Sequence, residues 1–184
     1  MGIILGVTGA VVIILIIWVI SVYNGLVSSR IKVETQWSQI DVQLKMRADL
    51  IPNIVETVSA YAGHEKELIN SVTRSREKMM GAASPEEEIA ADGQLKNSLK
   101  SLFAFAENYP DLKANANFIE MQKQLETIEK KIADFRQFYN DTIMIFNRKT
   151  EIFPSNIVAS MFGFKPKSFY MATEQDRDQI KVKF

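Results

Sequence analysis

Residues 3–22 read IILGVTGAVVIILIIWVISV, and this stretch decides how the rest of the chain is organised. An α-helix rises about 1.5 Å per residue, so a run of this length covers roughly the 30 Å hydrocarbon core of a bilayer. No Lys, Arg, Asp, Glu or His occurs among the first 29 residues. The sequence therefore predicts a membrane-spanning helix at its N-terminus.

A cleaved secretory signal is the main alternative to a membrane anchor. Such a signal has a basic N-terminal region, an apolar run of roughly 7–15 residues and a cleavage site with small side chains. Here no basic residue precedes the run, the run is longer, and residues 22–26 (VYNGL) contain no Ala-x-Ala pattern. A buried helix of a soluble protein would need to be covered on every side. We therefore expect a single, uncleaved anchor.

Composition places the remaining residues in one helical domain. Lys plus Arg and Asp plus Glu both number 22, so no basic field favours nucleic acid as a partner. The absence of Cys excludes disulfides and thiolate metal sites, and only 8 Gly and 5 Pro occur. We expect an anchor with its junction at residues 1–29, a helical bundle at 30–170 and a polar tail at 171–184.

The apolar residues after the anchor alternate between three- and four-residue spacings, the pattern of a helix that packs against other helices. The residues in this frame are Val33, Trp37, Ile40, Leu44, Ile51, Ile54, Val58, Tyr61, Leu68 and Val72. Arg47 and Glu65 interrupt the frame. No helix stop separates it from the anchor, so we expect one nearly continuous helix to about residue 80, kinked at Pro52.

Two further long helices are predicted. Ser84, Pro85 and Glu87 form a capping-box start, which places the second helix at roughly 85–108. The third helix keeps the same spacing from Phe118 to Phe146 and ends at Phe153-Pro154, before a short helix over 155–162. The predicted fold is all-α: a single transmembrane helix that continues into an elongated antiparallel bundle of three main helices and a short C-terminal helix.

Several sequence motifs together resemble the LemA family of bacterial membrane proteins. They are YNGLV at 23–27, WSQIDVQLK at 37–45, RADLIPN at 47–53, YAGHE at 61–65, AENYPDLKAN at 106–115, YN at 139–140, FPSN at 153–156 and GF at 163–164. The resemblance covers nearly the whole chain up to Tyr170. It implies an N-terminal membrane segment and an antiparallel helical bundle, but no catalytic residues.

Arg47 occupies a position in the apolar frame, and a buried guanidinium needs charged or polar partners. An antiparallel pairing that places Trp37 near Phe146 would bring Arg47 close to residues 132–140. The candidate partners in a buried polar layer are Asp134, Tyr139 and Asn140. Two alternatives stay open: a kink at Pro52 that turns Arg47 toward solvent, and a ligand site at Arg47.

Catalytic and metal-binding patterns are weak in this sequence. His64 is the only histidine, so no pair of His ligands is available for zinc, and a Ser–His–Asp triad would depend on that one residue. We expect no enzyme activity, no metal and no cofactor.

Basic and aromatic residues alternate near the C-terminus, a composition that suits the headgroup region of a membrane. Together with two charges after the anchor, the membrane-interface candidates are Arg30, Lys32, Arg148, Lys149, Phe162, Phe164, Lys165, Lys167, Phe169 and Tyr170. The alternative is that Phe153 and Phe162 cap the core of the bundle. Because basic residues follow the span and none precedes it, we expect the N-terminus outside and the bundle in the cytoplasm of a bacterial inner membrane.

The function expected from these features is that of a non-enzymatic, membrane-anchored bundle that self-associates and organises membrane or partner proteins. The expected partners are the lipid bilayer and other copies of the chain, because small residues in the span permit close helix packing. These residues are Gly2, Gly6, Thr8, Gly9 and Ala10. The alternative is a regulatory adaptor that binds another protein through its distal end, including Met79 and Met80. An unrecognised hydrolase is the least favoured reading.

Overall fold

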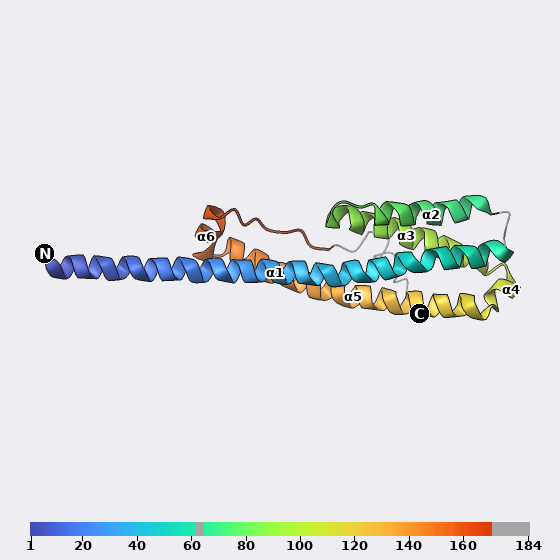
Figure 1. The fold of residues 1–184 in the computed structure, drawn as a ribbon, viewed down its shortest axis with the longest axis horizontal. Coiled ribbons are helices and arrows are strands. Elements are labelled where there is room, and N and C mark those ends of the chain that lie inside the picture. Colours follow the sequence, from blue (N-terminus) through green and yellow to red (C-terminus); the bar gives the residue numbers. More distant parts are fainter. Residues whose placement is uncertain (62–64, 171–184) are drawn as a thin grey trace, which may run out of the picture. The chain divides into compact units, whose positions relative to one another are not determined.

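The computed structural model describes residues 1–61 and 65–170, and within them every regular element is a helix (Figure 1). These helices are α1 (Gly2–Tyr61), α2 (Lys66–Met80), α3 (Pro85–Ala106), α4 (Pro110–Lys113), α5 (Ala116–Glu151) and α6 (Ser155–Met161). The predicted all-α fold is confirmed. The chain forms two compact units: unit 1 contains residues 1–37 and 137–169, and unit 2 contains residues 38–136 and Tyr170.

In unit 2, the C-terminal part of α1 runs antiparallel to the N-terminal part of α5. Asn115, just before α5, donates a side-chain hydrogen bond to the hydroxyl of Tyr61 at 3.1 Å, and Arg47 bonds to Glu129. The apolar frame residues of both helices form the core. Those below 2% exposure are Ile40, Leu44, Ile51, Ile54, Val58, Phe118 and Ile132.

The first helix ends earlier than the sequence predicted. It passes through Pro52, as expected, but α1 ends at Tyr61 and a separate helix, α2, begins at Lys66. Arg76 of α2 donates to the backbone carbonyl of Ala48 at 2.9 Å, so α2 returns alongside α1. An antiparallel helix buries one stripe just as a continuing helix does, and spacing therefore could not reveal the reversal. Tyr61, predicted in the frame, is 42% exposed.

Helix α3 begins as predicted. The Ser84 hydroxyl accepts a hydrogen bond from the backbone N–H of Glu87 at 3.2 Å, and the Glu87 carboxylate accepts one from the backbone N–H of Ala83 at 2.9 Å. These bonds satisfy two donors at the helix start that have no intrahelical partner. Helix α3 packs antiparallel to α2, with the hydroxyls of Ser75 and Ser98 2.9 Å apart.

In unit 1, the N-terminal part of α1 packs against the C-terminal part of α5 and against α6. The Lys149 ammonium donates to the backbone carbonyl of Gly25 at 3.2 Å and to the hydroxyl of Ser29 at 2.7 Å. Val158 and Ala159 of α6 are buried against Leu26. These contacts attach α6 to the same segment of α1 that α5 covers.

A tight turn after α6 directs the chain back toward α1. Gly163 has φ +72°, a conformation that favours glycine. Its N–H bonds to the carbonyl of Ser160 at 3.3 Å, and the N–H of Phe164 bonds to that of Ala159 at 2.9 Å. This pair of bonds is a Schellman motif. The turn places the ring of Phe164 5.8 Å from that of Tyr23.

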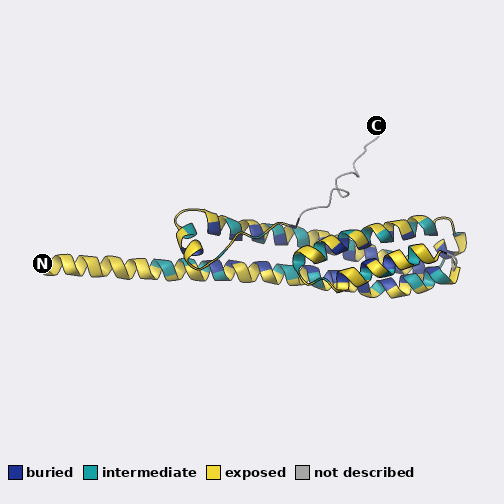
Figure 2. Ribbon diagram, turned by 90° about the horizontal axis from the view of Figure 1, so that it is seen from above, coloured by how far each residue is buried: buried dark blue, intermediate teal, exposed yellow. Residues whose placement is uncertain are grey.

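The first 17 residues of the chain, by contrast, are exposed (Figure 2). Among the described helices, only α1 contains a stretch long and apolar enough to cross a membrane, and none of that stretch is buried. An exposed apolar helix of this length is unfavourable in water, because its side chains order the surrounding solvent without any compensating contact.

Candidate functional site

Unit 2 contains a buried ionic cluster built from three helices. Arg47 of α1 lies at its centre, only 2% exposed, and its guanidinium bonds to the carboxylates of Asp92 in α3 and Glu129 in α5. Arg136 of α5 donates to the second oxygen of Asp92 at 2.7 Å. Asp92 is 1% exposed and therefore holds two guanidinium groups in the interior. Asp92 and Glu129 thus supply the carboxylates for both guanidinium groups of this cluster.

Tyr170 completes the cluster. Its hydroxyl accepts a hydrogen bond from Arg136 at 2.7 Å and donates one to Asp92 at 3.3 Å, while the Arg136 guanidinium lies 4.3 Å from the centre of its ring. Burial and the nearby charge of Asp92 raise the pKa of the Tyr170 hydroxyl well above its ordinary value. The hydroxyl therefore stays protonated and available as a donor at neutral pH.

The pKa of Arg47 is shifted in the opposite sense to that of Tyr170. Burial lowers the Arg47 pKa, because desolvation disfavours the charged guanidinium, and the carboxylate of Asp92 opposes this effect. An arginine keeps its charge even so, since its ordinary pKa is above about 12. The cluster is therefore ionic: its ion pairs connect α1, α3 and α5, and hydrogen bonds attach Tyr170 to them.

The partners of Arg47 differ from those that the sequence predicted. Asp134 is exposed and does not belong to a buried layer, whereas Tyr139 and Asn140 belong to unit 1. Tyr139 is buried there, with its ring 5.5 Å from that of Trp37. Trp37 was expected opposite Phe146, one heptad further along α5. A heptad pattern looks the same after a shift of seven residues, and the register was therefore wrong.

Sequence reasoning missed Asp92, Glu129 and Arg136. One signal was available: Asp92 precedes Leu95, Leu99, Leu102 and Ala106 in the same alternation of three- and four-residue spacings. A carboxylate in the frame of one helix and a guanidinium in the frame of another are complementary, because a buried charge needs a partner of opposite sign. Pairing Asp92 with Arg47, each a charged residue in a largely apolar frame, would have identified the core of the cluster.

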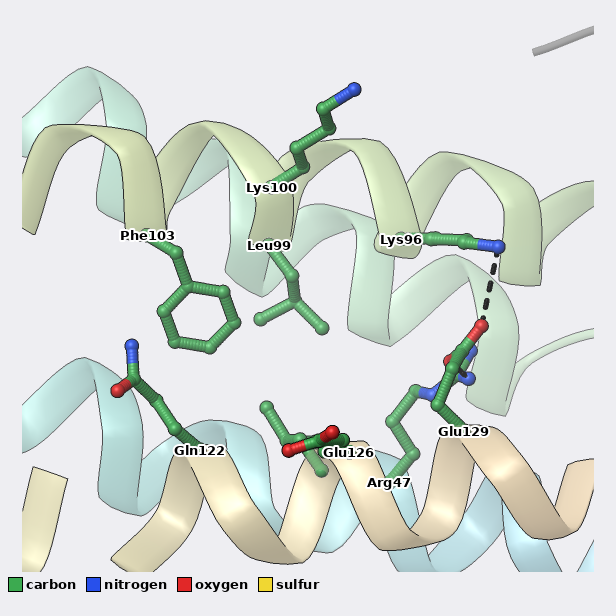
Figure 3. Close-up of a pocket in the computed structure, with 9 residues that line it drawn as sticks. Arg47, Lys96, Leu99, Lys100, Phe103, Gln122, Glu126 and Glu129 are labelled. Atoms are coloured by element: carbon green, nitrogen blue, oxygen red, sulfur yellow. Dashed lines mark hydrogen bonds and ion pairs between the residues drawn. The ribbon is translucent and has the colours of Figure 1, made fainter. Parts of the chain in front are cut away.

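A pocket of about 500 Å³ opens beside the cluster, between α3 and α5 (Figure 3). Leu99 and Phe103 of α3 and Leu125 of α5 give it apolar walls. Its edge is charged: Lys96 forms an ion pair with Glu129 at 3.2 Å, shown as a dashed line, and Lys100 and Glu126 flank the opening. Apolar walls with a charged edge suit an apolar side chain of a partner protein.

A second ionisable contact in unit 2 joins α1 and α3. Glu88 of α3 lies near Asp41 of α1, and burial together with the charge of Asp41 raises the pKa of Glu88 to about 7. Asp41 also accepts a bond from Lys45 at 2.7 Å. A nearby like charge disfavours the ionised form of a carboxyl group. Glu88 is therefore a group of unit 2 expected to titrate near neutral pH.

The predicted membrane-interface residues do not all lie in the same unit. Nine of them belong to unit 1: Arg30, Lys32, Arg148, Lys149, Phe162, Phe164, Lys165, Lys167 and Phe169. Arg30 lies 5.5 Å from the ring of Phe164, and Lys167 lies 3.9 Å from the carboxylate of Glu34. Tyr170 was placed wrongly, because it is 5% exposed in the cluster of unit 2. Phe153 and Phe162, the alternative caps of the core, are 78% and 52% exposed.

The described residues contain no group of three His, Asp or Glu side chains arranged to hold a metal ion. In the ionic cluster the carboxylates pair with guanidinium groups, and the hydroxyl of Tyr170 stays protonated. His64, at which neither a zinc site nor a catalytic triad was predicted, lies outside the described residues, as does the predicted polar tail. The arrangement described here can hold helices together and offer surfaces to partners.

These features define a class of protein: an all-helical chain with an uncovered apolar N-terminal helix and a second unit held by buried ion pairs. The sequence model of the LemA family matches residues 36–184, and this chain belongs to that family. The resemblance seen in the sequence motifs is thereby confirmed.

Individual relatives are distant but extend over most of the chain. A protein named LemA from Metamycoplasma hominis is 24% identical over 161 residues, which cover 85% of this chain and 72% of that protein. Magnetosome protein MamQ 2 from Paramagnetospirillum magneticum is 23% identical over 174 residues, covering 80% of this chain and 64% of its own length. Magnetosome protein MamQ from Magnetospirillum gryphiswaldense is 21% identical with the same coverage. This chain thus spans somewhat less than two thirds of the magnetosome relatives.

Proposed function

We propose that this protein is a non-enzymatic, membrane-anchored helical bundle that self-associates and organises membrane or partner proteins. The observation that carries the proposal is the exposed, uncharged surface of residues 1–17 in α1. This surface is stable in the hydrocarbon core of a bilayer and unstable in water. The relatives named as magnetosome proteins are assigned by that name to a subcellular structure, which supports an organising role over a catalytic one.

Self-association is supported by the small residues of the anchor. Gly2, Gly6 and Gly9 lie within about 60° of each other around the helix axis, at roughly 100° per residue. No neighbouring atom lies within 4 Å of the position that a side chain would occupy at any of them. Small residues on one side of a transmembrane helix let a second backbone approach closely.

Energy transfer between donor- and acceptor-labelled copies of the full chain in lipid vesicles tests this proposal. We expect transfer above the random-mixing level that persists when lipid dilutes the protein. The double substitution Gly6→Leu with Gly9→Leu should reduce it severalfold, because the larger side chains separate the helices. Val11→Leu, on the opposite side of the helix, is the matched control and should leave transfer unchanged. Random-mixing transfer in the original chain at every dilution would refute self-association.

The proposed orientation places unit 2 in the cytoplasm of a bacterial inner membrane. Arg30 and Lys32 follow the span, and Lys149 and Lys167 contact the same part of α1 through Ser29 and Glu34. Four basic residues next to one end of the span favour the cytoplasmic side for that end. A single cysteine replacing Lys123 should be protected from a membrane-impermeant thiol reagent in intact cells and react after inversion of the membranes. Labelling in intact cells would reverse the orientation.

An adaptor that binds another protein is the second candidate function, and the pocket between α3 and α5 favours it. Met79 and Met80 were expected to contribute to a binding surface at the distal end. Met79 is buried, at 4% exposure, so of these two residues only Met80 is accessible to a partner. A photo-crosslinker replacing Lys100 at the pocket edge distinguishes the two functions. An adaptor should give a cross-link to a different protein, lost with Leu99→Glu, whereas a self-associating protein should give only cross-links between copies of this chain.

A further inference from the structure

Helix α6 is apolar on both of its sides. Val158 and Ala159 are buried against α1, while Ile157 is 50% exposed and Met161 is 71% exposed on the opposite side. Phe153 before the helix and Phe162 after it are also exposed, at 78% and 52%. No charged residue occurs between 152 and 164. The outward side of α6 also carries the exposed Ser160, but its large exposed side chains are all apolar (Figure 2). A cluster of exposed apolar side chains marks a contact with a partner or a membrane.

The position of α6 along α1 indicates what covers it. Leu26 lies in the core that α6 forms with α1, and Trp18, Val19 and Val22 pack against the same core. Trp18, Val19 and Val22 belong to the apolar run at 3–22 that is long enough to span a bilayer. When that run occupies the hydrocarbon core, α6 lies beside its last turns, at the edge of the same layer (Figure 1).

The charges around α6 fit the same depth. Arg148 precedes it as an exposed side chain, and Lys165 and Lys167 follow it, with Lys165 exposed. Lysine and arginine side chains commonly extend from the edge of the hydrocarbon core to the phosphate groups. The rings of Tyr23 and Phe162, 4.8 Å apart, lie where aromatic residues are enriched in membrane proteins. Glu151 is the one acidic residue between 148 and 167, so the charges that flank α6 are positive on balance, which favours anionic headgroups.

We propose that α6 is a second membrane contact, an interfacial helix whose outward side enters the boundary between headgroups and acyl chains. The inserting residues are Phe153, Ile157, Met161 and Phe162. The ligand is the lipid surface next to the anchor, and the basic flanks contact its phosphates. This inference rests on the membrane anchoring in the proposed function. The anchor crosses both leaflets, whereas the side chains of α6 enter only one of them.

The absence of cysteine allows a direct test with the full-length protein. Single cysteines replace Ile157 or Met161, both already exposed, and carry a fluorophore whose emission shifts to shorter wavelength in an apolar environment. Ile13 within the span is the embedded control, and Lys123 of α5 is the aqueous control. Each variant is placed in vesicles of zwitterionic phospholipid, with and without an anionic phospholipid, that contain lipids with a nitroxide quencher at a shallow or a deep acyl position.

Labels at 157 and 161 should show a blue-shifted emission and stronger quenching by the shallow than by the deep nitroxide. The label at 13 should be quenched more by the deep nitroxide, and the label at 123 by neither. Because insertion is driven by apolar contact, the shallow quenching should persist without anionic lipid.

Two results would overturn the interfacial helix. Labels at 157 and 161 that behave like the label at 123, while the label at 13 is embedded, would place α6 in water and leave the anchor intact. Protection at 157 and 161 that disappears as lipid dilutes the protein would show that a second copy covers the face. An unquenched label at 13 is a separate outcome, because it would refute the anchoring on which the inference rests.

Discussion

The two units use charged and apolar side chains in opposite ways. Unit 2 buries Arg47 and Asp92 at 2% and 1% exposure and carries charged side chains over much of its exterior, whereas unit 1 exposes an uncharged helix end and the apolar side of α6. A charged exterior is suited to water. The uncharged end of α1 and the outward side of α6 are suited to lipid, because apolar surface carries no cost there. The comparison shows that a single chain combines a surface suited to water with a surface suited to lipid.

Removing the shared carboxylate should have the largest effect on this comparison. Asp92→Asn leaves two guanidinium groups in the interior of unit 2 without their common partner, and breaking a buried ion pair in this way costs about 3–5 kcal/mol. Denaturant unfolding of the detergent-solubilised chain, followed by circular dichroism, measures the loss. Asp134→Asn on the exposed side of α5 is the matched control and should change stability by less than about 0.5 kcal/mol. Equal effects at the two positions would show that the cluster does not stabilise unit 2.

Removing Arg47 should have a smaller effect than removing Asp92. In Arg47→Leu, Asp92 keeps Arg136 and Tyr170, and Glu129 keeps Lys96 at 3.2 Å. The remaining cost of incomplete pairing is about 1–3 kcal/mol. The same denaturant measurement checks it. A variant as stable as the original chain would mean that leucine packing compensates fully for the lost ion pairs, as occurs when whole buried ion pairs are replaced.

The carboxyl pair on α1 and α3 should make unit 2 less stable as pH rises through neutrality. The pKa of Glu88 is raised to about 7 from an ordinary value of 4.5, so the folded state binds the proton more tightly than the unfolded state. The stabilisation is therefore complete below about pH 4.5 and is lost as pH rises through about 7. Glu88→Gln should remove this slope and stabilise the protein at pH 8 by about 1 kcal/mol, since Glu88 is partly solvated.

Melting temperatures between pH 5 and pH 8 check this prediction. Glu86→Gln on the exposed side of α3 is the control and should keep the slope. A slope that survives in Glu88→Gln would assign the pH dependence to other groups.

The helical class could be predicted from spacing alone, because helix-forming stripes and the capping box at Ser84 depend on local sequence. The reversal between α1 and α2 and the register of α1 on α5 could not. A three-four spacing is unchanged when a helix turns back or shifts by one heptad, so the residues facing Arg47 were assigned to the wrong turn of α5. The partners in the ionic cluster come from three helices, and local pattern does not determine which helices are adjacent.

The membrane-facing residues show the same limit in unit 1. Composition marked the basic and aromatic segment near residues 148–170, but Tyr170 lies in the core of unit 2 and Ile157 and Met161 were not selected. Apolar residues in a short helix are normally assigned to a core. Only the packing of Val158 and Ala159 against Leu26 shows which side of α6 remains uncovered.

The smallest effect is expected on the outward side of α6, where the comparison between the units is sharpest. Ile157→Ser removes an exposed side chain and should change the stability of the detergent-solubilised chain by less than about 0.5 kcal/mol. Val158→Ser, one residue away but fully buried, should cost several times more, because it leaves a cavity and buries a hydroxyl. Thermal unfolding of the two variants in the same detergent gives the ratio. A large loss in Ile157→Ser would mean that Ile157 packs against protein, and the outward side of α6 would then resemble the core of unit 2 instead of contrasting with it.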